Sequence, residues 1–170
     1  MSSFESMIRA LVDSQMVKVA LVKDMPPLNI GPVKLGQWGS GDIATLPFPM
    51  AITLIRSGAA QVTQQDSLTI DDVRRALWIE TKEQALQQVD KGIYIKAKLN
   101  MASQQDPKQL QQAVRELAVA RLRKILYALA LSGGVLTNDI TDRLTPEEAV
   151  LAGELGRLIS TWLEWVVGYE

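Results

Sequence analysis

The sequence of 170 residues contains neither cysteine nor histidine. Without cysteine the chain has no thiol nucleophile and no disulfide, and without histidine it lacks the imidazole base of hydrolytic triads. The common zinc and iron ligands are missing as well. Carboxylates, lysines, tyrosines and serines could still perform chemistry, so the composition disfavours an enzyme without excluding one. We predict a protein that is not an enzyme, with no catalytic residue, no metal site and no cofactor.

Long apolar runs and the features of a signal peptide are also absent. No stretch approaches the ~20 apolar residues that a membrane-spanning helix needs. Residues 1–13 carry Glu5, Arg9 and Asp13, and they lack the basic and apolar regions of a signal peptide. We therefore predict a cytoplasmic protein that does not contact a membrane.

The composition that remains is typical of a globular chain with its own core. Apolar residues make up 47% of the sequence and charged residues 22%. An amphipathic helix is expected over residues 1–13. It is followed by a segment in which Val17, Val19 and Leu21 alternate with more polar side chains, the pattern of a half-buried strand.

A short helix is expected to begin at residues 46–49, Leu-Pro-Phe-Pro, because proline suits the first turn, where a backbone N–H is unpaired anyway. Gly58 would cap its end. Further extended segments are expected at residues 28–30, 33–35 and 60–62. These elements together predict a small β-rich domain over residues 1–65.

From Thr69 onward the apolar spacing is helical. Thr69 is a plausible N-cap, and Thr145-Pro146-Glu147-Glu148 has the composition of a full capping box. One helix is expected to begin at Thr69. Three further helices are expected over residues 90–101, 107–132 and 145–167. We predict an α+β fold, mainly α, in which the β-rich domain is followed by an α-helical bundle over residues 66–170.

Two features that suggest catalytic motifs have simpler interpretations. Residues 36–41 are rich in glycine, but they lack the Lys-Ser/Thr ending of a phosphate-binding loop and a surrounding βαβ unit, so a plain turn is expected. The acidic pairs Asp71/Asp72 and Glu147/Glu148 each fall in the first turn of a predicted helix. There a negative charge interacts favourably with the helix dipole.

The last two helices are apolar on more than one face, and such helices must be buried on most sides. Two interpretations remain open, a core shared with the rest of the chain or burial by a partner subunit. The tryptophans Trp162 and Trp165 fit either, since tryptophan is common in cores and at interface hot spots. For the second interpretation, the predicted interface residues are Leu122, Ile125, Leu129, Leu151, Leu155, Leu158 and Trp162.

A basic side on the helix predicted at residues 107–132 supports an alternative function. It is formed by Arg115, Arg121, Arg123 and Lys124. The net charge of the chain is only −1, so nucleic-acid binding would need such a local patch. The alternative is therefore a nucleic-acid-binding adaptor that uses this basic helix face.

The order of these elements resembles the GINS family, the accessory complex of the replicative helicase in archaea and eukaryotes. Residues 32–54 look like the small β domain of that family, in which a loop leads through an apolar, proline-containing segment into a short helix. Residues 90–99 resemble the helix after its connector. Residues 115–132 are similar to its long helix, and residues 144–148 to the Leu-Thr-Pro-Glu-Glu start of the next.

The resemblance implies a scaffold without catalytic residues. The β domain comes first, as in subunits of the Psf-two and Psf-three type, which archaea combine in one subunit. Two copies would join two copies of a paralogue with reversed domain order in a 2:2 heterotetramer. That assembly would bridge the MCM helicase to a RecJ-like or Cdc-forty-five-type protein near the nucleoid, with DNA contact only indirect or weak.

Overall fold

A three-stranded antiparallel sheet organises the N-terminal part of the chain. In the computed structural model, which describes residues 3–30, 33–35 and 37–168, the central strand is β1 (Met16–Leu21). It pairs with β4 (Ile43–Pro47) on one side and with β5 (Ala60–Val62) on the other. Val17, Val19 and Leu21 are buried, so the predicted alternation is confirmed.

Strand β4 was not predicted, and its presence corrects the expectation of a helix starting at residue 46. Residues 43–47 pair with β1, with Pro47 opposite Met16 at the end of the ladder. A proline is tolerated there because an edge strand does not need every N–H. The helix itself, α2 (Phe48–Arg56), follows at once and carries proline in its first turn, as expected.

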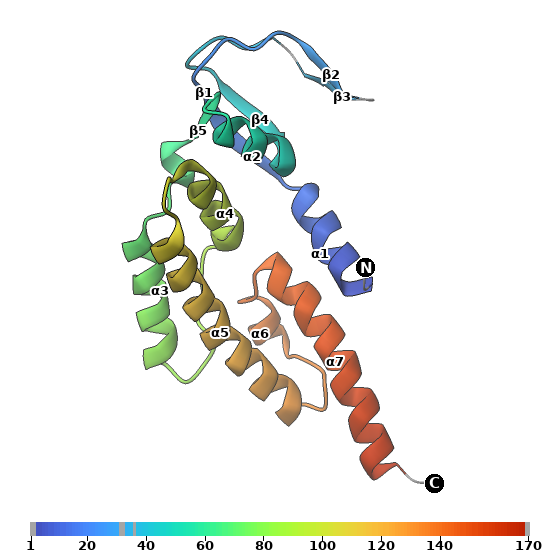
Figure 1. Cartoon of the computed structure of the whole chain (residues 1–170). Helices are drawn as coiled ribbons and strands as arrows, with labels where there is room; N and C mark the ends of the chain where they lie inside the picture. The colour runs from blue at the N-terminus through green and yellow to red at the C-terminus, as the bar shows by residue number, and fades with distance from the viewer. Residues whose placement is uncertain (1–2, 31–32, 36, 169–170) are drawn as a thin grey trace.

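The remaining strands form a separate hairpin. β2 (Leu28–Ile30) pairs antiparallel with β3 (Val33–Leu35), and the pair extends away from the sheet (Figure 1). A bridge between Met25 and Trp38 closes the base of this hairpin. The predicted glycine turn at residues 36–41 contains a hydrogen-bonded turn at Gly39–Asp42, while Gly36 lies outside the described residues.

Helices make up the rest of the chain, and the fold class is α+β, mainly α, as predicted. After a short 3₁₀ turn (Gln64–Asp66) come α3 (Ile70–Lys82), α4 (Ile93–Ser103), α5 (Lys108–Leu131), the unpredicted short helix α6 (Asn138–Thr141) and α7 (Pro146–Val167). The expected capping box of Thr145 with Glu148 is present, and the expected N-cap Thr69 forms a second capping box with Asp72. None of the helices among the described residues has the length and apolarity needed to cross a membrane.

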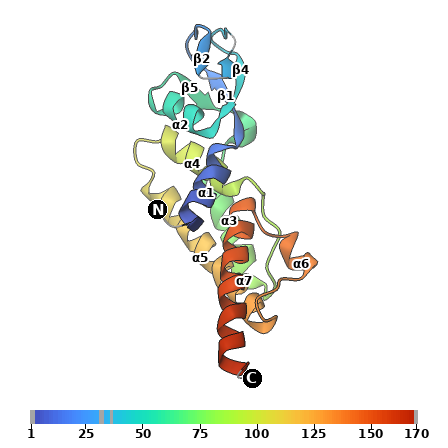
Figure 2. The same ribbon diagram turned by 90° about the vertical axis from the view of Figure 1, so that its right-hand side faces the viewer.

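Two contacts join the N-terminal elements to the helices. Ile95 and Leu99 of α4 belong to the same hydrophobic core as the sheet. The N-terminal helix α1 (Ser3–Asp13) packs against α7, beside the half of α7 nearer the sheet (Figures 1 and 2). Because these contacts cross residue 65, the division into domains 1–65 and 66–170 stays a prediction.

A close approach between backbones fixes α7 against the end of α5. Gly133 and Gly134, both with positive φ, follow α5, and the Ser160 hydroxyl donates to the Gly133 carbonyl at 2.6 Å. A Cβ atom on Gly156 would overlap the Gly134 carbonyl oxygen, whereas a Cβ on Gly153 would meet nothing within 4 Å. Gly156 therefore sets how closely the two segments pack.

We expect two alanine substitutions one turn apart in α7 to change the free energy of unfolding in opposite directions. Gly153→Ala should stabilise the chain by about 1 kcal/mol, because alanine favours a helix over glycine. Gly156→Ala has the same helical advantage but should destabilise the chain by about 1–3 kcal/mol, since a backbone carbonyl occupies the space of its methyl group. Urea unfolding of both variants measures this. Equal changes in the free energy of unfolding would contradict the close contact between Gly156 and the Gly134 carbonyl oxygen.

Candidate subunit interface and the buried charges behind it

A buried arginine joins three helices of the bundle. Arg121 of α5 has no solvent exposure, and its guanidinium lies 2.8 Å from a Glu80 carboxylate oxygen of α3 and 2.7 Å from one of Glu148 of α7. The carbonyl oxygens of Gln87 and Arg143 accept further bonds at 2.7 and 2.9 Å. With a second bond to Glu148, each of the five guanidinium N–H groups has a partner.

The two carboxylates are tied to further groups. The Tyr94 hydroxyl of α4 donates to Glu148 at 2.7 Å. The Lys124 ammonium lies 2.6 Å from Glu80 and donates to the carbonyl oxygens of Glu83 and Ala85, each at 2.9 Å. Because these bonds and ion pairs link groups on different helices, the cluster fixes the relative positions of α3, α4, α5 and α7.

This cluster corrects the predicted basic face. Arg121 and Lys124 are engaged with Glu80, so of the four residues of that face Arg115 and Arg123 remain exposed. The reason is helical spacing: Arg121 falls between Leu117 and Ile125, four residues from each, on the stripe that faces the core. A charge on an apolar stripe was the signal in the sequence that could have revealed the cluster.

The surroundings of the cluster shift the pKa of its members. Burial and the adjacent Glu148 carboxylate raise the pKa of Tyr94 well above its ordinary value of 10.0. Burial alone would lower the pKa of Arg121, but the hydrogen bonds and charge of Glu148 outweigh it, so this pKa is raised and the guanidinium stays charged. Both groups are therefore protonated in the folded chain at neutral pH.

The raised pKa of Tyr94 predicts a loss of stability in alkali. Above about pH 10 the tyrosine ionises in the unfolded chain but not in the folded one, so the unfolded state binds fewer protons and the free energy of unfolding falls as pH rises. Tyr94→Phe should reduce the slope of this fall in the free energy of unfolding between pH 10 and 11. Tyr127→Phe, at an exposed position, is the matched control. Equal slopes for both variants in urea unfolding would contradict the buried state of Tyr94.

The structure divides the predicted interface residues into three groups, which are buried, half-buried and exposed. Ile125 and Leu129 are 1% exposed and pack with Leu144 and Ala152, so the chain itself covers them and their assignment to an interface is corrected. Leu155 packs partly against the same core. Leu122 and Leu151 are half-buried, as Leu155 is, and Leu158 and Trp162 form the exposed group.

The exposed group extends into a continuous apolar surface on α7. Leu158 is 68% exposed, Trp162 60% and Trp165 67%. Spacings of three and four residues bring them to one side of the helix. With Glu154, Arg157 and Thr161 they line a shallow hollow of about 500 Å³. We call Leu158, Trp162 and Trp165 the α7 patch.

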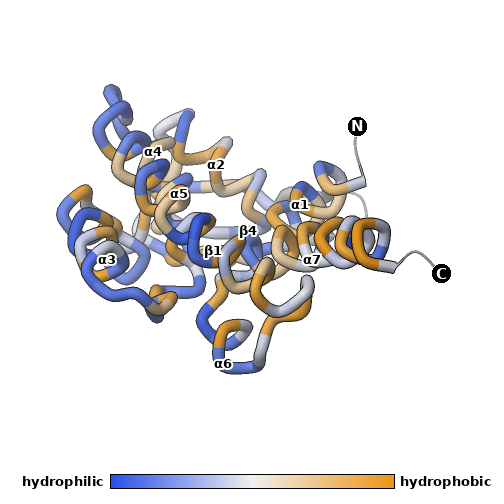
Figure 3. The backbone as a smooth tube through the Cα atoms, turned by 90° about the horizontal axis from the view of Figure 1, so that it is seen from below, coloured by the Kyte–Doolittle hydropathy of each residue, from blue (hydrophilic) through white to orange (hydrophobic). Residues whose placement is uncertain are grey.

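The α7 patch lies on the part of α7 that other elements leave uncovered. In Figures 1 and 2, α1 lies beside the first half of α7, and the second half extends past the end of α5. The view from below shows apolar segments along this helix (Figure 3).

Within the described residues no carboxylate cluster suited to a metal ion is present.

One comparison with known proteins identifies the helical part. The family model of the GINS complex protein helical bundle domain matches residues 67–167, from just before α3 to the end of α7. No curated protein matches the sequence at a significant level. The family match covers more than half of the chain, including the buried cluster and the α7 patch. The chain therefore belongs to the family of GINS complex proteins.

Proposed function

We propose that this chain is a non-catalytic subunit of a GINS replication complex and that the α7 patch binds another subunit. The α7 patch carries the proposal. It places two tryptophans and a leucine, each more than half exposed, on one side of one helix. Aromatic side chains gathered in this way are typical of interface hot spots, and exposed apolar patches commonly mark association sites.

The buried cluster supports the proposal, because it would hold the patch in a fixed orientation. Arg121, Glu148 and Tyr94 connect the first turn of α7 to α5 and α4, and the patch lies further along the same helix. A rigid helix loses little conformational freedom on binding, which favours association.

The order of the domains supports a finer assignment. The strands and α2 precede the residues matched by the family model, so we assign the chain to the Psf-two and Psf-three type, in its archaeal form. Its partner would be a paralogous subunit of reversed domain order, in a 2:2 heterotetramer. Located in the cytoplasm near the nucleoid, that complex would hold the MCM helicase and a RecJ-like or Cdc-forty-five-type protein together. It would activate the helicase by binding one of its conformations more tightly than the others.

Co-expression with such a paralogue tests the proposal. The isolated chain should self-associate at micromolar concentration, because the α7 patch then has no natural partner. Together with the paralogue it should sediment as one species of 2:2 composition. A stable monomer that forms no complex with the paralogue would refute the proposal.

A further inference from the structure

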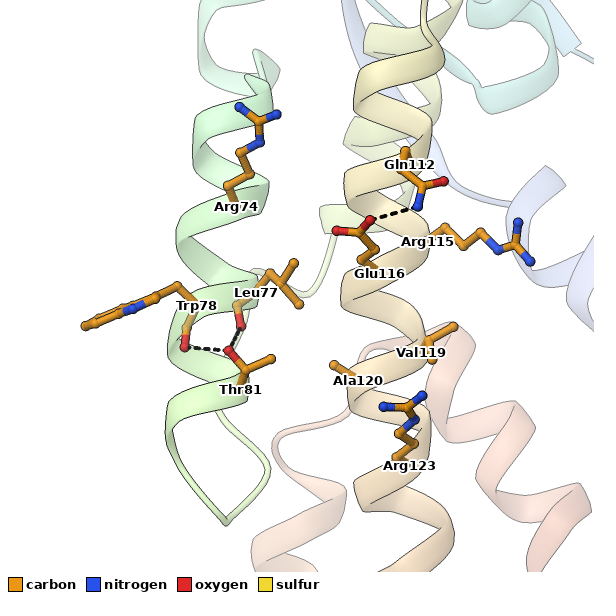
Figure 4. Close-up of a pocket in the computed structure, with 10 residues that line it drawn as sticks. All are labelled: Arg74, Leu77, Trp78, Thr81, Gln112, Arg115, Glu116, Val119, Ala120 and Arg123. Carbon is orange, nitrogen blue, oxygen red and sulfur yellow. Dashed lines mark hydrogen bonds between the residues drawn. The ribbon is translucent and has the colours of Figure 1, made fainter.

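A second surface lies between α3 and α5. Leu77 and Thr81 of α3 and Ala120 of α5 line a groove of about 550 Å³ (Figure 4). Figure 4 shows Trp78 and Arg115 pointing outward at its two sides. Helices α3 and α7 lie on opposite sides of α5, so this groove is distinct from the α7 patch (Figures 1 and 3).

Positive charge dominates the rim of the groove. Arg74, Arg115 and Arg123 line it, and Glu116, the acidic residue among the lining residues, accepts a hydrogen bond from Gln112 at 2.7 Å. Arg74 lies 3.9 Å from Asp71 in a solvent-exposed pair, which contributes little. In the part of the chain that the structure describes, Arg115 and Arg123 form no ion pair. Their charges are therefore available to a partner.

The groove also has an aromatic anchor. Trp78 is 60% exposed, and the ammonium group of Lys82 lies over its ring, 4.9 Å from the centroid. This cation–π contact restricts the orientation of the ring, so a partner would not need to order it. Val119 supplies further exposed apolar surface on the α5 side.

We propose that this groove binds an acidic, amphipathic helical segment of a partner protein. Apolar side chains of the segment would pack on Leu77, Trp78 and Val119, and its carboxylates would pair with the arginines of the rim. Arg115 and Arg123 are two turns apart on α5, roughly 12 Å along the axis. Carboxylates seven or eight residues apart on a partner helix match this distance.

The lining favours such a segment over a nucleic acid. Most of the lining surface is apolar, so it suits the apolar side chains of a peptide better than a phosphate backbone. Lys82 already occupies one face of Trp78, the surface on which a base would stack.

A peptide-display library tests the proposal on the full-length chain. Random 16-residue peptides are selected on the native protein and then measured by fluorescence anisotropy against Arg115→Glu/Arg123→Glu and Trp78→Ala. The binders should be rich in acidic and apolar residues, and each variant should weaken them at least about tenfold. Arg56→Glu, an exposed charge reversal on α2, is the matched control and should leave affinity unchanged.

Controls separate the other outcomes. Circular dichroism checks the fold of each variant, and Arg115→Gln/Arg123→Gln, which removes charge without reversing it, should weaken binding to a smaller extent. Failure to recover binders, binders without acidic enrichment, or equal affinity for Arg56→Glu and Arg115→Glu/Arg123→Glu would each overturn the proposal. So would a single-stranded 20-nucleotide oligonucleotide that binds the native protein and competes with the peptides.

Discussion

Arg121→Met should destabilise the folded chain by about 3–5 kcal/mol, because it leaves the buried carboxylate of Glu148 without its cation. Methionine has nearly the volume of the aliphatic part of arginine, so the loss arises from charge and hydrogen bonds rather than from a large cavity. Lys124 still pairs with Glu80, and the main loss therefore falls at Glu148. The melting temperature should decrease by roughly 6–20 °C for a chain of this size.

Arg123→Met is the matched control for this substitution. It makes the same chemical change two residues further along α5 at an exposed position, and it should alter stability by less than about 0.5 kcal/mol. Combining Arg121→Met with Glu148→Gln should recover part of the loss, since the uncompensated charge of Glu148 is then removed. If the melting temperatures of Arg121→Met and Arg123→Met were equal, the buried position of Arg121 would be wrong.

Leu158→Asp should keep the chain folded and weaken its assembly with a partner subunit. Leu158 is 68% exposed, so an aspartate there remains in water in the isolated chain. In the complex the same carboxylate would be buried without a partner. Loss of an interface anchor costs on the order of 2 kcal/mol or more, which is about a thirtyfold weakening of association.

Circular dichroism and co-purification on the same samples measure both effects. Leu155→Asp, one turn earlier, is the informative contrast, because Leu155 packs partly against the core. It should lower the melting temperature itself. Retained helix with a lost partner for Leu158→Asp supports the α7 patch as an interface. An unchanged complex would show that another surface joins the subunits.

The sequence determined the elements whose signals are local. A capping box needs only residues three positions apart, so the starts of α3 and α7 could be read from Thr69 and Thr145. The alternation that buries Val17, Val19 and Leu21 is equally local. The length of α5 and the glycines that end it follow from the same kind of pattern.

The tertiary structure decided which neighbour each strand and helix contacts. Residues 43–47 became a strand because β1 offers hydrogen bonds along its edge, which no local propensity reveals. Arg121 points inward because Glu80 and Glu148, 41 and 27 residues away in the sequence, are brought to its side.

The buried and the exposed members of the predicted interface show the same distinction. Ile125 and Leu158 are aliphatic residues on apolar stripes, and the sequence treats them alike. The first is buried by the chain, and the second is exposed because α7 extends past the elements that could cover it. Burial of an apolar side chain depends on the neighbours that the fold supplies, and the hydrophobic effect does not distinguish a residue of the same chain from one of a partner.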